Sequence, residues 1–373
     1  MSFTTKSTGH HRIGVAKGEG SLQRVSIGDV PLDSGVVLPE VEVVVETAGS
    51  FSADANNAVL VCHALTGDAH AVGNEEKPGW WRGLIGPQGY INTEKWFVIT
   101  MNVLGGCNGT TGPTSINPQT GKHYRSDFPY VSIRDMVRVQ KRCLDVLGIS
   151  YLHAIIGGSM GGMMVLEWGL LFPECVGRLV PIATASSLTP TAIAYNDIGR
   201  QAIVSDPDFK QGNYDYAQPP TKGLAIARMM GMITYRTNSL FEKRFSRALQ
   251  AGVQEGEDSV FQIESYLRYQ GRKLAERFDA NSYLRLLKAM DTHDLGWGRG
   301  GVTKALRQLQ CPVLVIGFQE DILFPIDQQR QLYQHIQHVH PSNQFLEMTS
   351  EYGHDAFLIE FDEWGSATRD FLG

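Results

Sequence analysis

The sequence has few of the features that would direct a protein to nucleic acid, to a membrane or to a metal ion. Its 33 Lys and Arg residues stand against 39 Asp and Glu, so the formal net charge is -6 and the basic excess of nucleic-acid-binding proteins is missing. Its five cysteines are scattered and never spaced as C-x-x-C, which argues against a disulfide framework and against a zinc site. We therefore expect no metal, no nucleic-acid partner and a reducing, cytoplasmic compartment.

Long uncharged segments are also scarce, and neither of the two that occur is typical of a membrane span. Residues 96–121 are rich in Asn, Thr and Gly, and residues 146–166 are interrupted by two Gly-Gly pairs and a central Ser. The first twenty residues are polar and basic, and they lack the apolar core of a secretory signal. These patterns predict a protein without a transmembrane segment.

Short apolar runs alternate with helical patterns in the first and last parts of the chain. Several runs are apolar throughout, as in strands covered on both faces. The helical pattern at 133–147 begins with Ser132 and Asp135 as a capping box and stops at Gly148. The expected strands are 41–45, 58–62, 96–101, 154–156, 179–182, 313–316 and 345–348. The alternation predicts an α/β fold with a mostly parallel sheet and helices on both faces.

The pattern changes in the middle of the chain. Between residues 186 and 295 we expect no strand, because apolar residues there recur at helical spacing. The expected helical segments are 191–204, 223–234 and 260–273. We interpret 186–295 as a helical lid inserted into a core that is formed by residues 1–185 and 296–373.

One glycine-rich turn carries a candidate nucleophile. Gly157-Gly158-Ser159-Met160-Gly161-Gly162 follows an apolar run and opens an apolar helical segment, which is the setting in which G-x-S-x-G is informative. Such a turn strains the backbone of Ser159, and glycines at 157 and 161 avoid side-chain collisions. The context favours a catalytic serine over a chance match in a chain with 40 glycines.

A serine hydroxyl needs a base and an orienting carboxylate, and later segments supply both in the order acid, then histidine. Glu320 and Asp321 follow an expected strand, and either fits the acid on this evidence. His354 follows the last expected strand, whereas most of the other histidines are better explained as surface or core residues. The predicted triad is therefore Ser159, His354 and one of the two carboxylates.

An oxyanion hole needs backbone N–H donors close to the developing charge. Met160 would supply one, because it directly follows the serine at the start of its helix. The other donor should follow an earlier strand, where residues 62–67 read Cys-His-Ala-Leu-Thr-Gly, and we choose the N–H of Leu65. For His63 a structural hydrogen-bonding role is the better explanation.

With these residues identified, the sequence resembles the homoserine O-acetyltransferase family over nearly its whole length. The resemblance implies an α/β-hydrolase fold, and it selects Asp321 over Glu320 because the family acid begins the D-x-L-F-P segment. The shared segments are C-H-A-L-T-G-D-A-H at 62–70, G-W-W at 79–81, N-V-L-G-G-C-N-G-T-T-G-P at 102–113, G-G-S-M-G-G-M at 157–163, A-R-M at 227–229, E-S-Y-L-R-Y-Q-G at 264–271, D-I-L-F-P at 321–325 and G-H-D-A-F-L at 353–358.

The resemblance also implies the substrates and the assembly. It implies acetyl-CoA as co-substrate with no bound cofactor, L-homoserine as acceptor, a role in methionine biosynthesis and a homodimer formed through the helical insertion. Arg228 and Asp355 would bind the carboxylate and the ammonium of the amino acid, and Tyr235 would add a hydrogen bond.

Met164 and Ile322 depart from many relatives, which carry Gln and Trp there. Both positions look peripheral to the triad, but they weaken the inference about the acceptor.

The acyl donor and the reaction class have alternatives. Some relatives use succinyl-CoA, and burying a succinyl carboxylate against the apolar Leu323 would be costly, which favours acetyl. Serine O-acetylation, homoserine O-succinylation and ester hydrolysis are alternatives within the same fold. Binding without catalysis is another, but the intact Ser159, Asp321 and His354 argue against it.

Overall fold

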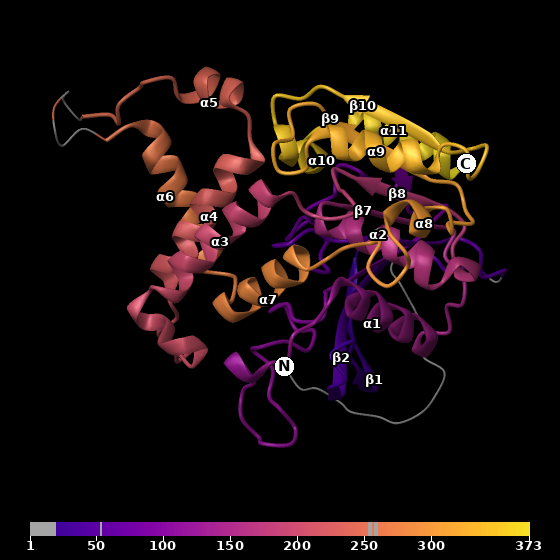
Figure 1. Ribbon diagram of the computed structural model, residues 1–373, viewed down its shortest axis with the longest axis horizontal. Coiled ribbons are helices and arrows are strands. Elements are labelled where there is room, and N and C mark those ends of the chain that lie inside the picture. Colours follow the sequence, from indigo (N-terminus) through magenta and orange to yellow (C-terminus); the bar gives the residue numbers. More distant parts are fainter. Residues whose placement is uncertain (1–19, 53, 253–255, 257–259) are drawn as a thin grey trace.

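A sheet of eight strands runs through the larger part of the molecule in the order β1-β2-β6-β3-β7-β8-β9-β10 (Figure 1). The computed structural model describes residues 20–52, 54–252, 256 and 260–373. The nineteen residues before them, which belong to the stretch without a secretory signal pattern, lie outside the described part. The strands are β1 (Ser21–Pro31), β2 (Val37–Ala48), β3 (Ala58–Cys62), β6 (Phe97–Met101), β7 (Ala154–Gly158), β8 (Leu179–Ile182), β9 (Leu314–Phe318) and β10 (Gln344–Met348), with β4 (Ile85–Gly86) and β5 (Ile91–Asn92) forming a separate pair.

The expected mostly parallel sheet is confirmed. From β6 to β10 all neighbouring strands are parallel, whereas β2 pairs antiparallel with both β1 and β6. Each of the seven expected strands is present with ends shifted by up to four residues. Strand β1 was not expected. Its inward Val25 and Ile27 alternate with polar residues at the edge of the sheet, so its apolar signal is short.

Helices cover both faces of this sheet, as expected. Alternate strand residues enter different apolar clusters: Leu60 belongs to the cluster that includes side chains of α1, α2 and α9, whereas Val59 and Val61 belong to the cluster that includes side chains of α11. At the start of α1, Ser132 Oγ accepts from the N–H of Asp135 at 3.0 Å, which confirms the capping box. The helices of this core are α1 (Ile133–Val146), α2 (Met160–Leu171), α8 (Val302–Leu306), α9 (Ile326–Ile336), α10 (Ala356–Ile359) and α11 (Asp362–Leu372).

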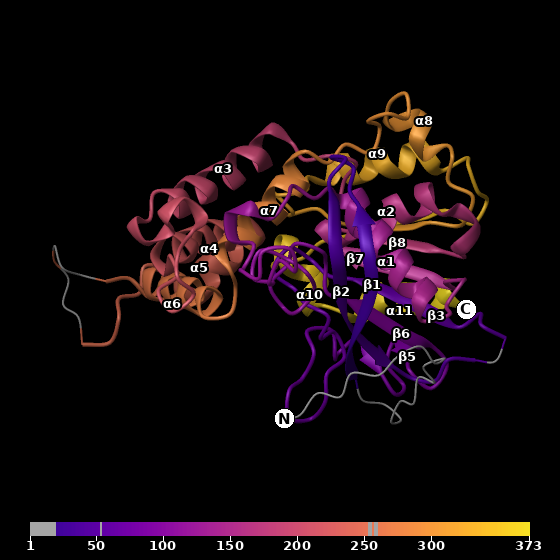
Figure 2. The same ribbon diagram turned by 90° about the horizontal axis from the view of Figure 1, so that it is seen from below.

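A second group of helices lies beside the sheet, and Figures 1 and 2 both show it to one side of the core. All of them fall between β8 and β9 in the chain, and the three expected segments are confirmed as α3, α4 and α6. The division at residues 186 and 295 stays our interpretation, and we call residues 186–295 the lid. Its helices are α3 (Pro190–Val204), α4 (Thr221–Tyr235), α5 (Asn238–Phe245), α6 (Gln262–Ala275) and α7 (Ala280–Asp291). Short 3-10 segments are η1 (Arg125–Asp127), η2 (Pro173–Cys175), η3 (Pro207–Gly212), which has a kink at Lys210 and Gln211, and η4 (Gly353–Asp355).

A buried carboxylate joins the core to the chain that returns from the lid. Glu167 of α2 is fully buried, and its Oε2 lies 2.6 Å from Arg299 Nη2 while its Oε1 lies 3.1 Å from Arg134 Nε of α1. Arg134 Nη2 also donates to the carbonyl oxygen of Trp297 at 2.7 Å. A carboxylate with two guanidinium partners tolerates such burial, so α2 and the returning segment are held in one position.

None of the helices in the described part of the chain combines the length and the apolar character that crossing a membrane requires.

Large apolar side chains are exposed on three helices of the lid, α3, α4 and α6: Ile198, Val204, Ile226, Ile233 and Tyr269. Ile226 and Ile233 are seven residues apart on α4 and therefore share one helical face. Exposed apolar side chains gathered in this way are typical of association surfaces.

We predict that two copies of the chain associate through this face of the lid. The double variant Ile226→Glu, Ile233→Glu should sediment as a monomer at a concentration where the wild type sediments as a dimer, because four carboxylates would meet across a symmetric contact. Val146→Glu, an equally exposed apolar site on the core, is the control and should leave the dimer intact. A monomeric wild type would contradict the prediction.

Candidate active site

Four of the predicted reactive positions follow strands that end at the same edge of the sheet. Leu65 follows β3, Ser159 follows β7, Asp321 follows β9, and His354 lies in η4 after β10. These four strands are parallel to one another, so their carboxyl ends meet at one edge. The fold thus brings together residues that are up to 289 positions apart in the chain (65 to 354).

Ser159 occupies a sharp turn between β7 and α2. Its φ of 58° and ψ of -124° lie in a region that residues with side chains rarely adopt, which confirms the expected strain. A Cβ at Gly157 would lie 2.7 Å from the carbonyl oxygen of Cys62, and one at Gly161 would lie 2.1 Å from the same oxygen. The turn therefore packs directly against the end of β3, and only glycine fits on either side of the serine.

The carboxylate of Asp321 holds the imidazole of His354. Asp321 Oδ2 lies 2.7 Å from His354 Nδ1, and its Oδ1 accepts the N–H groups of Leu323 at 2.9 Å and Phe324 at 2.8 Å. Glu320 instead accepts the N–H of Ser350 at 2.8 Å. Of the two carboxylates that sequence patterns alone left open, Asp321 is therefore the one in contact with the histidine.

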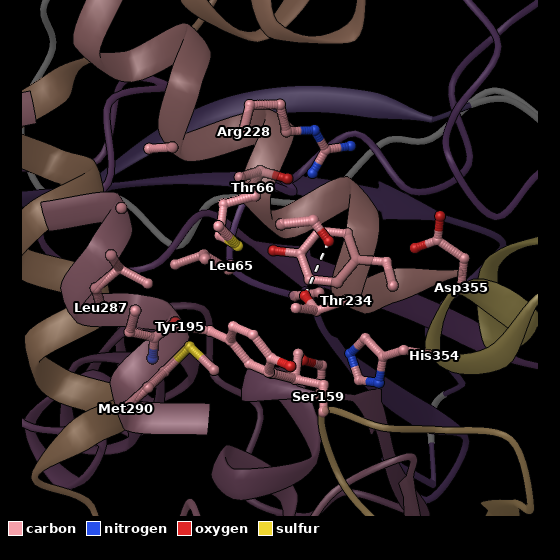
Figure 3. A pocket seen from close by; sticks show the side chains of 18 of the residues that line it. Leu65, Thr66, Ser159, Tyr195, Arg228, Thr234, Leu287, Met290, His354 and Asp355 are labelled. Carbon is pink, nitrogen blue, oxygen red and sulfur yellow. Dashed lines mark hydrogen bonds between the residues drawn. The ribbon is translucent and has the colours of Figure 1, made fainter. Parts of the chain in front are cut away.

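The imidazole is also fixed by aromatic neighbours. The ring of Phe324 stacks on it with a centroid separation of 5.2 Å, and those of Phe357 and Tyr235 lie at 5.5 and 5.8 Å. Because Nδ1 faces a carboxylate, it carries the proton, and Nε2 is the basic nitrogen. Ser159 and His354 line the same pocket (Figure 3), although no hydrogen bond joins them among the described residues. Such contacts often tighten only when substrate is bound.

Two backbone N–H groups beside the serine are available to a developing oxyanion. Met160 is the first residue of α2, so its N–H has no partner within the helix. Leu65 lines the pocket, and its N–H donates to no acceptor in the part of the chain that the structure describes. Both predicted donors are therefore unengaged near the serine.

The predicted substrate-binding residues line the same pocket. Arg228 comes from α4, and its guanidinium carbon lies 5.3 Å from the centre of the Tyr235 ring. Asp355 follows His354 and accepts from Arg236 Nε at 3.2 Å through Oδ2. Burial raises the pKa of Asp355 above its ordinary value, an effect that the nearby Arg236 and Arg228 oppose. Figure 3 shows Arg228 and Asp355 around the space above Ser159 and His354.

The sequence patterns did not identify three residues that line the pocket or pair with a residue that lines it. Tyr283 of α7 and Tyr195 of α3 line the pocket, and Arg236 forms the ion pair with Asp355. Burial raises the pKa of Tyr283 far above its ordinary value, so its hydroxyl stays protonated. All three come from the lid, where no local motif marks them, and only the packing of the lid on the core could have identified them.

The described residues contain no cluster of three or more His, Cys, Asp or Glu side chains that could hold a metal ion. The pocket instead combines a few polar groups with apolar walls from both parts of the chain. Leu287 and Met290 of α7 face it from the lid, and Leu323 and Phe357 face it from the core. Such a mixture suits a small ligand with an apolar group and a few charged ones.

Comparison with known proteins agrees with this geometry. A family model described as alpha/beta hydrolase fold matches residues 57–361. The chain is 48% identical over 346 residues to a protein from Moorella thermoacetica named homoserine O-acetyltransferase, covering 91% of this chain and 92% of that one. The crystal structure of homoserine O-acetyltransferase from Bacillus anthracis matches with a TM-score of 0.89 and 28% identity, covering 95% of this chain and 98% of that one. The crystal structure of esterase E22 matches with a TM-score of 0.87 and 29% identity, covering 95% and 100%.

Proposed function

Because this chain belongs to the homoserine O-acetyltransferase family and to the α/β-hydrolase fold, we propose that it transfers an acetyl group from acetyl-CoA to the side-chain hydroxyl of L-homoserine, a reaction of methionine biosynthesis. One observation carries the chemistry: Ser159 stands on a strained turn in the same pocket as a histidine whose Nδ1 lies 2.7 Å from Asp321. The reaction needs no metal and no resident cofactor, since acetyl-CoA is consumed as a substrate. We place it in the cytoplasm, because all five cysteines are free thiols.

The first half of the reaction forms an acetyl-enzyme. Ser159 Oγ attacks the thioester carbonyl carbon while His354 Nε2 takes its proton, and Asp321 stabilises the imidazolium that results. The N–H groups of Leu65 and Met160 bind the oxyanion of the tetrahedral intermediate. The C–S bond then breaks, CoA leaves as a thiol with the proton from His354, and the acetyl group remains on the serine as an ester.

The second half transfers the acetyl group to the amino acid. Homoserine enters in place of CoA, and His354 Nε2 removes the proton of its side-chain hydroxyl as that oxygen attacks the acetyl carbon. The same oxyanion donors act again, the bond to Ser159 Oγ breaks, and the serine regains its proton from His354. O-acetylhomoserine leaves and the enzyme returns to its starting state.

The zwitterionic end of homoserine fits the charges at the lid side of the pocket. Arg228 has no carboxylate partner within ion-pair distance in the described residues, so its guanidinium is free to bind the substrate carboxylate. Asp355 uses Oδ2 for Arg236 and keeps Oδ1 for the substrate ammonium. Tyr235 and Tyr283 stand beside Arg228 with protonated hydroxyls that can hydrogen-bond the same carboxylate.

The test of this function follows free thiol in mixtures of the protein, acetyl-CoA and one acceptor. We expect steady thiol release with L-homoserine, at least tenfold slower release with L-serine, and with water alone only one equivalent of thiol from acetyl-enzyme formation. Ser159→Ala should abolish release, whereas Ser186→Ala, outside the pocket, should not. Steady release without an acceptor would make the protein an esterase, equal use of serine would change the acceptor, and no release at all would refute acyl transfer.

A second prediction concerns the acyl donor. Leu323 lines the pocket and is nearly buried, whereas its neighbour Ile322 is half exposed and outside the pocket. Leu323→Arg should shift the ratio of kcat/KM for succinyl-CoA over acetyl-CoA upward by at least about tenfold, because a guanidinium would compensate the buried succinyl carboxylate. Ile322→Arg is the matched control. An unchanged donor preference in Leu323→Arg would defeat the argument.

A third prediction uses the raised pKa of Asp355. Below its pKa the carboxyl is neutral and no longer attracts the substrate ammonium, so the KM for homoserine should rise as the pH falls, by about tenfold per unit once the pH is below that pKa. Because burial raises the pKa of Asp355, the rise should begin above the range of an ordinary aspartate. The KM for acetyl-CoA in the same experiments is the control.

Asp355→Asn should raise the KM for homoserine about 10- to 100-fold at neutral pH, as expected for the loss of a charged hydrogen bond, and remove its dependence on acidic pH. A variant that kept the wild-type pH dependence would show that another group binds the ammonium.

A further inference from the structure

His63 is buried at the start of the loop 63–67, which follows β3 and carries the proposed oxyanion donor Leu65 (the oxyanion loop), and both of its ring nitrogens are engaged. Nδ1 lies 2.8 Å from the carbonyl oxygen of Ala64, and Nε2 lies 3.1 Å from the backbone N of Val103. Only 1% of the side chain is exposed. His63 thus makes the structural hydrogen bonds expected of it, and its two partners determine the protonation state of the ring.

The partners allow only one protonation state of the ring. The backbone N–H of Val103 can only donate, so Nε2 must accept and carries no proton. The carbonyl oxygen of Ala64 can only accept, so Nδ1 must carry the proton and donate. Burial lowers the pKa of His63, which agrees with a neutral ring. His63 is therefore unsuited to be a general base or a metal ligand, because neither nitrogen is free.

The carbonyl that His63 holds belongs to the same peptide unit as the oxyanion donor Leu65. A trans peptide is planar, and its C=O and N–H point in opposite directions. The carbonyl oxygen of Ala64 accepts from His63 Nδ1 and also from the N–H of Gly67 at 2.9 Å. The N–H of Leu65, on the opposite side of the peptide unit, donates to no acceptor among the described residues, and both Ala64 and Leu65 line the pocket.

We propose that His63 is a positioning residue of the oxyanion hole: its Nδ1–H fixes the orientation of the Ala64–Leu65 peptide so that the N–H of Leu65 points at the developing oxyanion. The inference rests on the proposed acyl-transfer function and adds to it a residue that touches no substrate. The loop 102–106, through Val103, sets the tautomer of His63, so the oxyanion donor is aligned through a relay of two hydrogen bonds. Such prior orientation matters because a donor that must rotate during the reaction stabilises the transition state less.

Two substitutions separate this role from simple packing. In His63→Asn the amide nitrogen is bonded to Cγ, as Nδ1 is, so it can still donate to the carbonyl oxygen of Ala64. In His63→Gln the terminal amide reaches the place of Nε2 and can accept from Val103, but no side chain donates to the carbonyl oxygen of Ala64, which keeps only the N–H of Gly67. Both variants keep an amide at the site, and its different reach decides which of the two hydrogen bonds of His63 survives.

We expect His63→Gln to lower kcat about 100-fold, the scale of losing one oxyanion donor, with the KM for homoserine unchanged. His63→Asn should stay within about fivefold of the wild-type kcat. Thermal unfolding of both variants monitors the fold. Equal losses of kcat in the two variants, or a wild-type kcat in His63→Gln, would overturn the proposal.

The same comparison with p-nitrophenyl acetate keeps the inference separate from the identity of the acceptor. Any acyl group on Ser159 uses the oxyanion hole, so the ratio of acylation rates between the two variants should persist even if homoserine proves not to be the acceptor. Nitrogen NMR shifts of histidine-labelled wild-type protein provide a measurement without substitution. At neutral pH they should show His63 protonated at Nδ1 only, and a proton on Nε2 of His63 would refute the relay.

Discussion

The parallel pairing of β3, β7, β9 and β10 is the constraint on which the site depends. Because their carboxyl ends meet at one edge, four segments from distant parts of the chain bring the predicted oxyanion donor, nucleophile, acid and base to one place. The close approach of the serine turn to the end of β3 then fixes the nucleophile relative to the oxyanion loop. A shift of one residue in this pairing would displace the reactive groups relative to one another.

A feature of the fold or the site could be predicted from the sequence when the residues that mark it are contiguous in the chain. Ser159 was identifiable because its glycines, strand and helix are contiguous, and the buried strands were identifiable because they are apolar throughout. Glu320 and Asp321 are adjacent in the chain and differ mainly in where their side chains point, so local patterns could not separate them and a family resemblance was needed. Arg236 and Tyr283 reach the pocket only through the way the lid packs on the core, which no short stretch of sequence encodes.

The arrangement of strands and helices does not by itself set the reaction. The chain shares its fold with esterase E22 as closely as with a homoserine O-acetyltransferase, so the fold alone does not decide whether water or an alcohol attacks the acyl group. The apolar Leu287 and Met290 and the charged Arg228 all come from the lid. Under the proposed function, the acceptor would therefore contact side chains from a part of the molecule that contributes none of the proposed reactive atoms.

The position of the lid within the sequence has a consequence for the order in which the enzyme is made. Leu65, Ser159 and Met160 are translated before the lid, whereas Asp321 and His354 are translated after it. A ribosome that has completed the lid has thus produced a serine and its oxyanion donors but no proton acceptor for that serine. The unfinished polypeptide lacks the base that the proposed mechanism needs, which is added only with His354, after the last strand of the sheet.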